Sequence, residues 1–276
     1  MFLLPAAAAS VVLFILPLGV FLTNSVFDLV TVRGTKSAFT LQNYWKILAD
    51  PFYWRAFWTT LQLAAAVVAG TLLLGYPLAY MLARSRSRWR SIVTSLVIIS
   101  LFVSVVIRAL GWKLILGPTG PVNSALLKIG IISEPLRLSD NFLGTVIGLI
   151  HAELPFMILM LIPVIQLVPR SLEDAALSLG ASWLRVFWRV TLPLSLPGIV
   201  SGCLMVASLS IGAFTTPALL SGGREPFVPL LIEQQVLQLL NYPAGAALAA
   251  ILVVMVLVLN ALVFRIFRTR LYGMPA

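Results

Sequence analysis

Long apolar runs alternate with short polar segments along the whole chain. The runs reach 18 or more residues, the length that an α-helix needs to cross the hydrocarbon core of a bilayer. Backbone groups must bond to one another there, so we expect these runs to be helical. We predict an all-α polytopic membrane protein in which residues 1–276 form a single transmembrane domain. Its six expected transmembrane helices are 6–27, 57–82, 92–116, 142–167, 193–216 and 246–267.

The polar segment between spans four and five, residues 169–192, has the pattern of a short helical loop. Pro169 disfavours helix at the residue before it and is expected to end span four. Ser171 and Asp174 have the spacing of a capping box, which predicts that a new helix starts here. Gly180 can adopt the left-handed conformation that ends such a helix. A second short helix is expected next, with three apolar residues recurring at helical spacing: Trp183, Phe187 and Val190.

Composition supports a membrane protein and limits its chemistry. Hydrophobic residues make up 60% of the chain and charged residues 10%, with a mean hydropathy of +1.03, whereas soluble domains average about 25% charged residues. The single Cys203 and the single His151 exclude a disulfide framework, a cysteine-based metal site and a multi-histidine cluster. The sequence has no Gly-x-x-x-x-Gly-Lys-Ser/Thr loop, so we do not expect this chain to hydrolyse ATP by itself.

The distribution of basic residues predicts the orientation in the membrane. The net charge of +10 comes from residues in the loops, so it indicates topology rather than nucleic-acid binding. Arginines follow spans two, four and six, which places these loops and both termini in the cytoplasm, although Arg33 and Lys36 oppose this bias. The first span is expected to be retained, because it lacks the basic start of a signal peptide. The basic residues counted as cytoplasmic are Arg84, Arg86, Arg88, Arg90, Arg170, Arg185, Arg189, Arg265, Arg268 and Arg270.

Residues 173–193 resemble the cytoplasmic EAA loop of ABC-importer permeases, which docks into the ATP-hydrolysing subunit. The pattern of that family is Glu-Ala-Ala, three residues, Gly, nine residues, Ile, one residue and Leu-Pro. Asp174 stands for the Glu and Val190 for the Ile. The resemblance implies that the matching residues, together with Glu173, couple this chain to an ATPase subunit. The direct matches are Ala175, Ala176, Gly180, Leu192 and Pro193.

Over nearly its whole length the chain resembles the polyamine (spermidine/putrescine) group of these permeases, most closely the first of their two permease subunits. The segments that carry this likeness are 39–44, 75–84, 108–123 and 194–202. The resemblance implies a bacterial inner-membrane complex with a second, different permease, two ATPase subunits and an extracytoplasmic substrate-binding protein. ATP and Mg²⁺ belong to the ATPase subunits, and this chain is expected to bind no cofactor or metal ion. Related subunits import ferric iron, thiamine, phosphonates or opines, so the solute stays open.

Polar residues near or within the spans are candidates for the translocation path. Glu153 lies about 12 residues, or about 18 Å, into span four, where a carboxylate is by default a functional hypothesis. It either attracts a cation in the path or pairs with Arg108 or with the second permease. Arg108 either snorkels to the interface or lines the path. His151 is two residues from Glu153 and is expected to be a separate buried group. Two further candidates are Trp112 and Thr216.

Two other classes of membrane protein fit the sequence less well. An intramembrane enzyme needs clustered acids, histidines or a nucleotide loop, whereas Glu153, His151 and Arg108 are scattered singly. A secondary transporter is expected to show repeat symmetry and paired intramembrane charges, and it leaves the loop 169–192 unexplained. We therefore expect a non-catalytic transport subunit.

Overall fold

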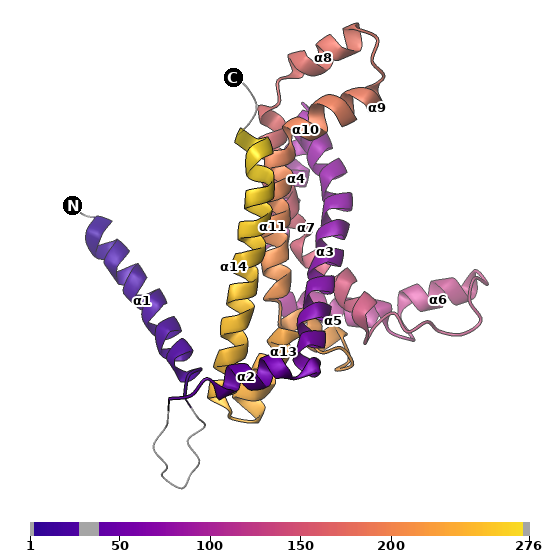
Figure 1. The fold of residues 1–276 in the computed structure, drawn as a ribbon. Helices are drawn as coiled ribbons and strands as arrows, with labels where there is room; N and C mark the ends of the chain where they lie inside the picture. Colours follow the sequence, from indigo (N-terminus) through magenta and orange to yellow (C-terminus); the bar gives the residue numbers. More distant parts are fainter. Residues whose placement is uncertain (1–2, 28–38, 273–276) are drawn as a thin grey trace. The chain divides into compact units, whose positions relative to one another are not determined.

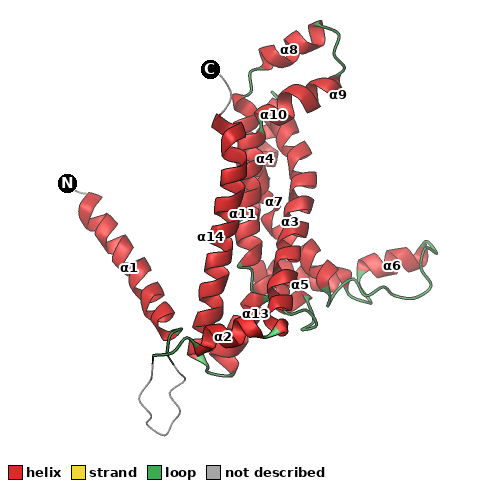
Figure 2. Cartoon of the chain, viewed as in Figure 1, coloured by secondary structure: helices red, strands yellow, loops and turns green. Residues whose placement is uncertain are grey.

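A computed structural model describes residues 3–27 and 39–272 of the chain (Figure 1). The regular structure of these residues is helical apart from one isolated bridge between Phe27 and Phe39 (Figure 2). Long apolar runs therefore form helices, and the predicted all-α class is confirmed.

Contacts divide the chain into two compact units, which we describe one at a time. The first comprises Met1–Thr60 and Pro226–Val258, and the second comprises Leu61–Glu225 and Leu259–Ala276. Two long helices, α3 (Pro51–Arg84) and α14 (Tyr242–Tyr272), contribute residues to both.

The first unit combines an early and a late segment of the sequence, and hydrogen bonds hold its elements together. The Asn43 amide donates to the carbonyl oxygens of Ser25 and Phe27 at 3.1 and 2.9 Å, which fixes the connection before α2. The Val228 N–H donates to the Thr60 hydroxyl at 3.1 Å and so attaches α13 to α3. Besides parts of α3 and α14, this unit contains α1 (Leu3–Asn24), α2 (Gln42–Ala49), α13 (Val228–Glu233) and the π-helix η2 (Gln234–Gln238).

The second unit is built around α7 (Phe142–Leu167), which packs closely against α11 (Leu196–Ile211). A Cβ atom at Gly198 would lie 2.9 Å from the Cβ of Val164, and one at Gly202 would lie 2.6 Å from the Met157 sulfur. These glycines let the two backbones approach, as small residues do between membrane helices. The other helices of this unit are α4 (Trp89–Ser100), α5 (Val105–Leu116), α6 (Pro121–Lys128), α8 (Arg170–Ser178), α9 (Trp183–Val186), η1 (Phe187–Thr191), α10 (Leu192–Leu194) and α12 (Thr215–Leu220).

Three of the described helices are long and apolar enough to cross a membrane, and they correspond to predicted spans two, four and six. They are Pro51–Arg84, Phe142–Leu167 and Tyr242–Phe267. Two more spans are possible only as bent pairs, Trp89–Ser100 with Val105–Lys128 at 98° and Trp183–Leu194 with Leu196–Ile211 at 65°. The described residues thus support three to five spans, and the count of six stays a prediction.

The third predicted span, 92–116, is wrong as a continuous helix. α4 ends at Ser100, whose hydroxyl donates to the Val97 carbonyl at 2.6 Å, and such local bonds compete with the helix. The Arg108 guanidinium donates to the carbonyl of Val103 at 2.9 Å, which satisfies a group that the break frees. The fifth predicted span, 193–216, is divided as well, because α11 ends at Ile211 and Thr216 belongs to α12.

Candidate functional site

The loop 169–192 contains the predicted short helix, α8, but Ser171 does not cap it. Pro169 occupies the N-cap position, and the helix already includes Arg170, so Ser171 lies within its first turn. The capping-box prediction is therefore wrong. Proline has a fixed φ suited to a helix start, and the carbonyl of Pro169 accepts the N–H of Leu172 at 3.2 Å.

The end of α8 follows the prediction. Gly180 has a φ of +80°, and its N–H donates to the Leu177 carbonyl at 2.9 Å. The N–H of Ala181 donates to the Ala176 carbonyl at 3.1 Å. This pair of bonds is the Schellman motif, which ends a helix with a left-handed residue. The loop therefore turns back sharply after α8 towards Trp183, the first residue of α9.

Glu173 ties α8 to two other elements of the second unit. Its Oε1 atom lies 2.6 Å from Arg84 Nη2, at the end of α3, and accepts the hydroxyl of Thr191 in η1 at 2.7 Å. Arg84 also donates to the carbonyl of Val168 at 3.0 Å, and Arg170 donates back to the Arg84 carbonyl at 2.5 Å. We call the Arg84–Glu173–Thr191 group the loop latch. Charge-assisted bonds of this kind are roughly twice as strong as neutral ones.

Aromatic side chains reinforce the same connection. The Phe187 ring packs edge-on against Tyr76 and Tyr80 of α3, with ring centroids 5.6 and 6.0 Å apart, and it stacks on Trp183 at 6.1 Å. The hydroxyl of Tyr76 is 2.7 Å from that of Ser195, at the start of α11. The loop is thus held to α3 by both polar and aromatic contacts, so α8 and α3 are expected to move together.

The outer surface of the loop is open and partly apolar. Asp174 and Ala175 are exposed, Ala176 is half-buried, and Leu179 is 89% exposed. Leu192 and Pro193 are half-buried in α10, where the chain returns towards α11. Several large apolar side chains exposed in one short loop suggest an interaction surface. Its other large apolar members are Leu172, Leu177, Trp183, Leu184 and Trp188.

Glu153 is buried in the centre of the second unit, with 5% of its surface exposed. Its Oε2 atom accepts the hydroxyl of Ser210, from α11, at 2.7 Å. The alternative pairing with Arg108 does not form, because Arg108 donates to the carbonyls of Ala152 and Val103 at 3.3 and 2.9 Å. The carboxylate therefore has a hydroxyl partner and no cationic one among the described residues.

The remaining path candidates lie around α7 without forming one cluster. His151 is exposed, so the prediction of a buried histidine is wrong. Its ring packs against the Trp112 ring at 5.7 Å, in a T-shaped arrangement. Thr216 is 2% exposed and sits where a Cβ atom on Gly148 would approach its methyl group to 2.9 Å. None of the contacts described for Trp112 and Thr216 involves the Glu153–Ser210 pair.

Sequence reasoning missed three residues that determine these sites. The sequence identifies Arg84 only as a topology signal and as part of the family-like segment 75–84, and it does not single out Thr191 or Ser210. Ser210 is a hydroxyl residue within an apolar run, and Arg84 is the last residue of a span, so both carried a weak signal. Their partners are 57 and 89 residues away in the chain, and no local pattern predicts such pairs.

Residues 75–269 match the family described as binding-protein-dependent transport system inner membrane component. A Haemophilus influenzae protein, the spermidine/putrescine transport system permease protein PotB, is 34% identical over 226 residues, which cover 82% of this chain and 79% of the relative. PotB of Escherichia coli is 35% identical over 212 residues, which cover 77% of each chain.

Solved structures share the fold. A bacterial alginate ABC transporter chain, from a complex with an alginate-pentasaccharide-bound periplasmic protein, matches with a TM-score of 0.78 and 20% identity, covering 97% of this chain and 92% of that one. A MetNI methionine ABC transporter chain matches with a TM-score of 0.63 and 18% identity, covering 80% of this chain and 98% of that one. From the family match and these relatives, the chain belongs to the binding-protein-dependent transport system inner membrane components, and it is a membrane-embedded, non-catalytic permease subunit of an ABC importer.

Proposed function

We propose that this chain forms half of the translocation path of an ATP-driven importer for polyamines, with spermidine and putrescine as the solutes. The observation that carries this proposal is the 34–35% identity to two PotB proteins over more than three quarters of the chain. The complex is expected to contain a second, different permease, two ATPase subunits and an extracytoplasmic binding protein. ATP and Mg²⁺ bind to the ATPase subunits.

The loop 169–192 is the proposed contact with an ATPase subunit, and it faces the cytoplasm together with both termini. Asp174, Ala175 and Leu179 are exposed on it, and nothing lies within 4 Å of a Cβ atom placed on Gly180. Small residues beside exposed leucines leave room for the surface of a partner. The arginines that follow spans two, four and six support this orientation.

Movement of the ATPase subunits reaches the spans through the loop latch. A displacement of α8 acts directly on Arg84 at the end of α3 and on Thr191 in η1, because both bind the Glu173 carboxylate. Thr191 leads into α10 and α11, and α11 packs against α7. When the ATPase pair closes on ATP, α3 and α11 are therefore expected to move, and the translocation path switches between outward and inward access.

Glu153 is the proposed cation-attracting group of the path. A buried carboxylate with no cationic partner among the described residues favours a positively charged solute, and polyamines carry several ammonium groups. The hydroxyl of Ser210 holds this carboxylate in place at 2.7 Å.

Uptake of radiolabelled spermidine by proteoliposomes that contain the assembled complex tests the proposal. Unlabelled spermidine is expected to compete with the uptake of the radiolabelled spermidine, whereas thiamine, ferric iron and phosphonate are not expected to compete. Glu153→Gln is expected to raise the apparent KM for spermidine at unchanged protein levels. Ala175→Arg is expected to abolish uptake, and the ATPase subunit should be lost from the complex at the same time. Uptake of one of the other solutes instead, or normal uptake by Ala175→Arg, would contradict the proposal.

A further inference from the structure

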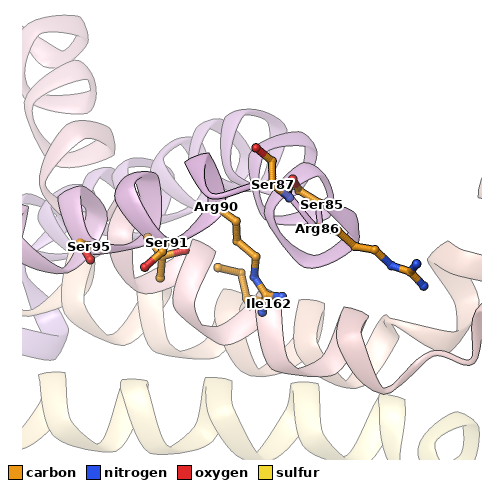
Figure 3. Close-up of a pocket in the computed structure, with 8 residues that line it drawn as sticks. Ser85, Arg86, Ser87, Arg90, Ser91, Ser95 and Ile162 are labelled. Carbon is orange, nitrogen blue, oxygen red and sulfur yellow. Dashed lines mark hydrogen bonds between the residues drawn. The ribbon is translucent and has the colours of Figure 1, made fainter.

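A polar cavity of about 420 Å³ lies between the start of α4 and the later part of α7 (Figure 3). Two arginines, Arg86 and Arg90, and five hydroxyl side chains line it, together with Ile162 of α7. Among the hydroxyl residues, Ser91, Thr94 and Ser95 recur along one side of α4. No acidic side chain is among the lining residues. This is the chemistry of a site for an anion with several acceptor oxygens.

The two arginines of the cavity have no counter-charge in the described part of the chain, whose ion pairs involve Arg84 and Lys113 instead. Arg90 is half-buried, and its guanidinium extends towards Ile162, whereas the exposed side chain of Arg86 points away from Arg90 (Figure 3). An anionic ligand would give the Arg90 guanidinium the charged partner that the described residues do not supply.

The surface beside the cavity is apolar. α4 buries none of its residues, and Ile92, Leu96 and Ile99 are 49%, 59% and 58% exposed at helical spacing. Trp89, at the start of the helix, is 70% exposed, as is typical of side chains at headgroup depth. α4 also belongs to one of the bent pairs that are apolar enough to cross a membrane. The polar cavity therefore continues into an apolar stripe, which fits an amphiphile better than a free anion.

We propose that this cavity binds the phosphate headgroup of an anionic phospholipid. Arg90 pairs with the phosphate, and Arg86 adds positive charge beside the opening. The hydroxyls of Ser91 and Thr94 donate to the phosphate oxygens, and the acyl chains lie along the Ile92–Leu96–Ile99 stripe. Ser85, which lines the cavity, directly follows Arg84 of the loop latch, so a bound lipid would stabilise the end of α3. This inference goes beyond the proposed transport function, and its readout requires no transport.

Native mass spectrometry of the assembled complex tests the site. The complex is placed in phosphatidylcholine nanodiscs that contain phosphatidylglycerol, and the retained phosphatidylglycerol is counted. Arg90→Gln is expected to lower retention roughly fivefold, as for the loss of one basic residue at a membrane surface. Thr94→Val leaves the charge unchanged and is expected to lower phosphatidylglycerol retention about threefold, as for the loss of one hydrogen bond. The matched control is Arg88→Gln, because Arg88 is an exposed arginine of the same turn that does not line the cavity.

If Arg90→Gln and Arg88→Gln lost phosphatidylglycerol equally, binding would be due to diffuse surface charge and the proposed site would be refuted. Unchanged lipid retention in both Arg90→Gln and Thr94→Val would also refute it. Displacement of the lipid by millimolar inorganic phosphate would assign the cavity to a free anion instead. Since the ATPase subunits are weighed in the same spectra, loss of the complex itself is distinguished from loss of the lipid.

Discussion

The Nη2 atom of Arg84 lies 2.6 Å from the Oε1 atom of Glu173, so the last residue of a long helix is bound directly to the helix of the polar loop. Each of the two side chains is only 13% exposed, which protects the pair from solvent. Glu173 therefore turns inwards, whereas its neighbour Asp174 is exposed. The two adjacent acids have different surroundings, and we expect different roles for them: Glu173 positions the loop, and Asp174 meets the partner.

Glu173→Gln is expected to loosen the loop, because a neutral amide loses the charge-assisted bond with Arg84. The loss is about 1–3 kcal/mol of local stability. Trypsin cleavage within residues 169–192 should therefore become faster, and less substrate should be moved per ATP hydrolysed. Asp174→Asn is the matched control, since its side chain has no partner in the latch and its cleavage rate should stay that of the parent. Equal cleavage rates for the two variants would refute the latch.

Gly180→Val is expected to destabilise the end of α8, since a β-branched residue is strained at a φ of +80°. The cost is about 1–2 kcal/mol. Gly180→Asn should be milder, because asparagine tolerates this conformation. A Cβ atom meets nothing within 4 Å, so any effect in the isolated chain is conformational. Limited proteolysis of the purified chain measures it, and a similar response to both substitutions would show that the left-handed conformation is unimportant.

Gly198→Ala is expected to lower the thermal stability of the purified chain. Its methyl group would lie 2.9 Å from the Cβ of Val164, a branched atom that cannot rotate away. Overpacking of this kind costs about 1–3 kcal/mol. Gly111→Ala, in α5, is the control, because a Cβ there meets nothing within 4 Å and alanine favours helix by about 0.5–1 kcal/mol. A melting temperature unchanged in Gly198→Ala would mean that α7 and α11 are packed less closely.

Ser210→Ala is expected to destabilise the chain by about 1–3 kcal/mol, because it leaves the buried Glu153 carboxylate without its hydroxyl donor. The same substitution should cost less in a Glu153→Gln background, since a neutral amide is less costly to bury unpaired. Thermal unfolding of the two single variants and the double variant measures this coupling. Strictly additive losses would indicate that the two side chains do not interact.

Local patterns in the sequence predicted the features that depend on local chemistry. Gly180 ends α8 because glycine is the residue that best tolerates a left-handed turn, and Pro169 separates α7 from α8. The apolar runs at 57–82, 142–167 and 246–267 became long helices, because their length and composition allow little else.

Features that depend on distant residues or on competition between local bonds were not predictable in this way. The break between Ser100 and Val105 lies within an apolar run that hydropathy reads as continuous. Ser171 failed as a cap because Pro169 begins the helix earlier. The partners of Glu173 and Glu153 come from other helices, so only the folded chain brings them together.

Site-specific photo-cross-linking from Ala175 tests the central claim, that the exposed face of α8 contacts an ATPase subunit. In a Cys203→Ser background, Ala175→Cys is labelled with a benzophenone maleimide and irradiated in the assembled complex. Ile131→Cys is the control, because Ile131 is 67% exposed in the segment that follows α6. Figure 1 shows α6 at the other end of the second unit from α8. We predict an adduct with the mass of this chain plus one ATPase subunit from Ala175→Cys and none from Ile131→Cys. An adduct with the binding protein, or no ATPase adduct at all, would contradict the account.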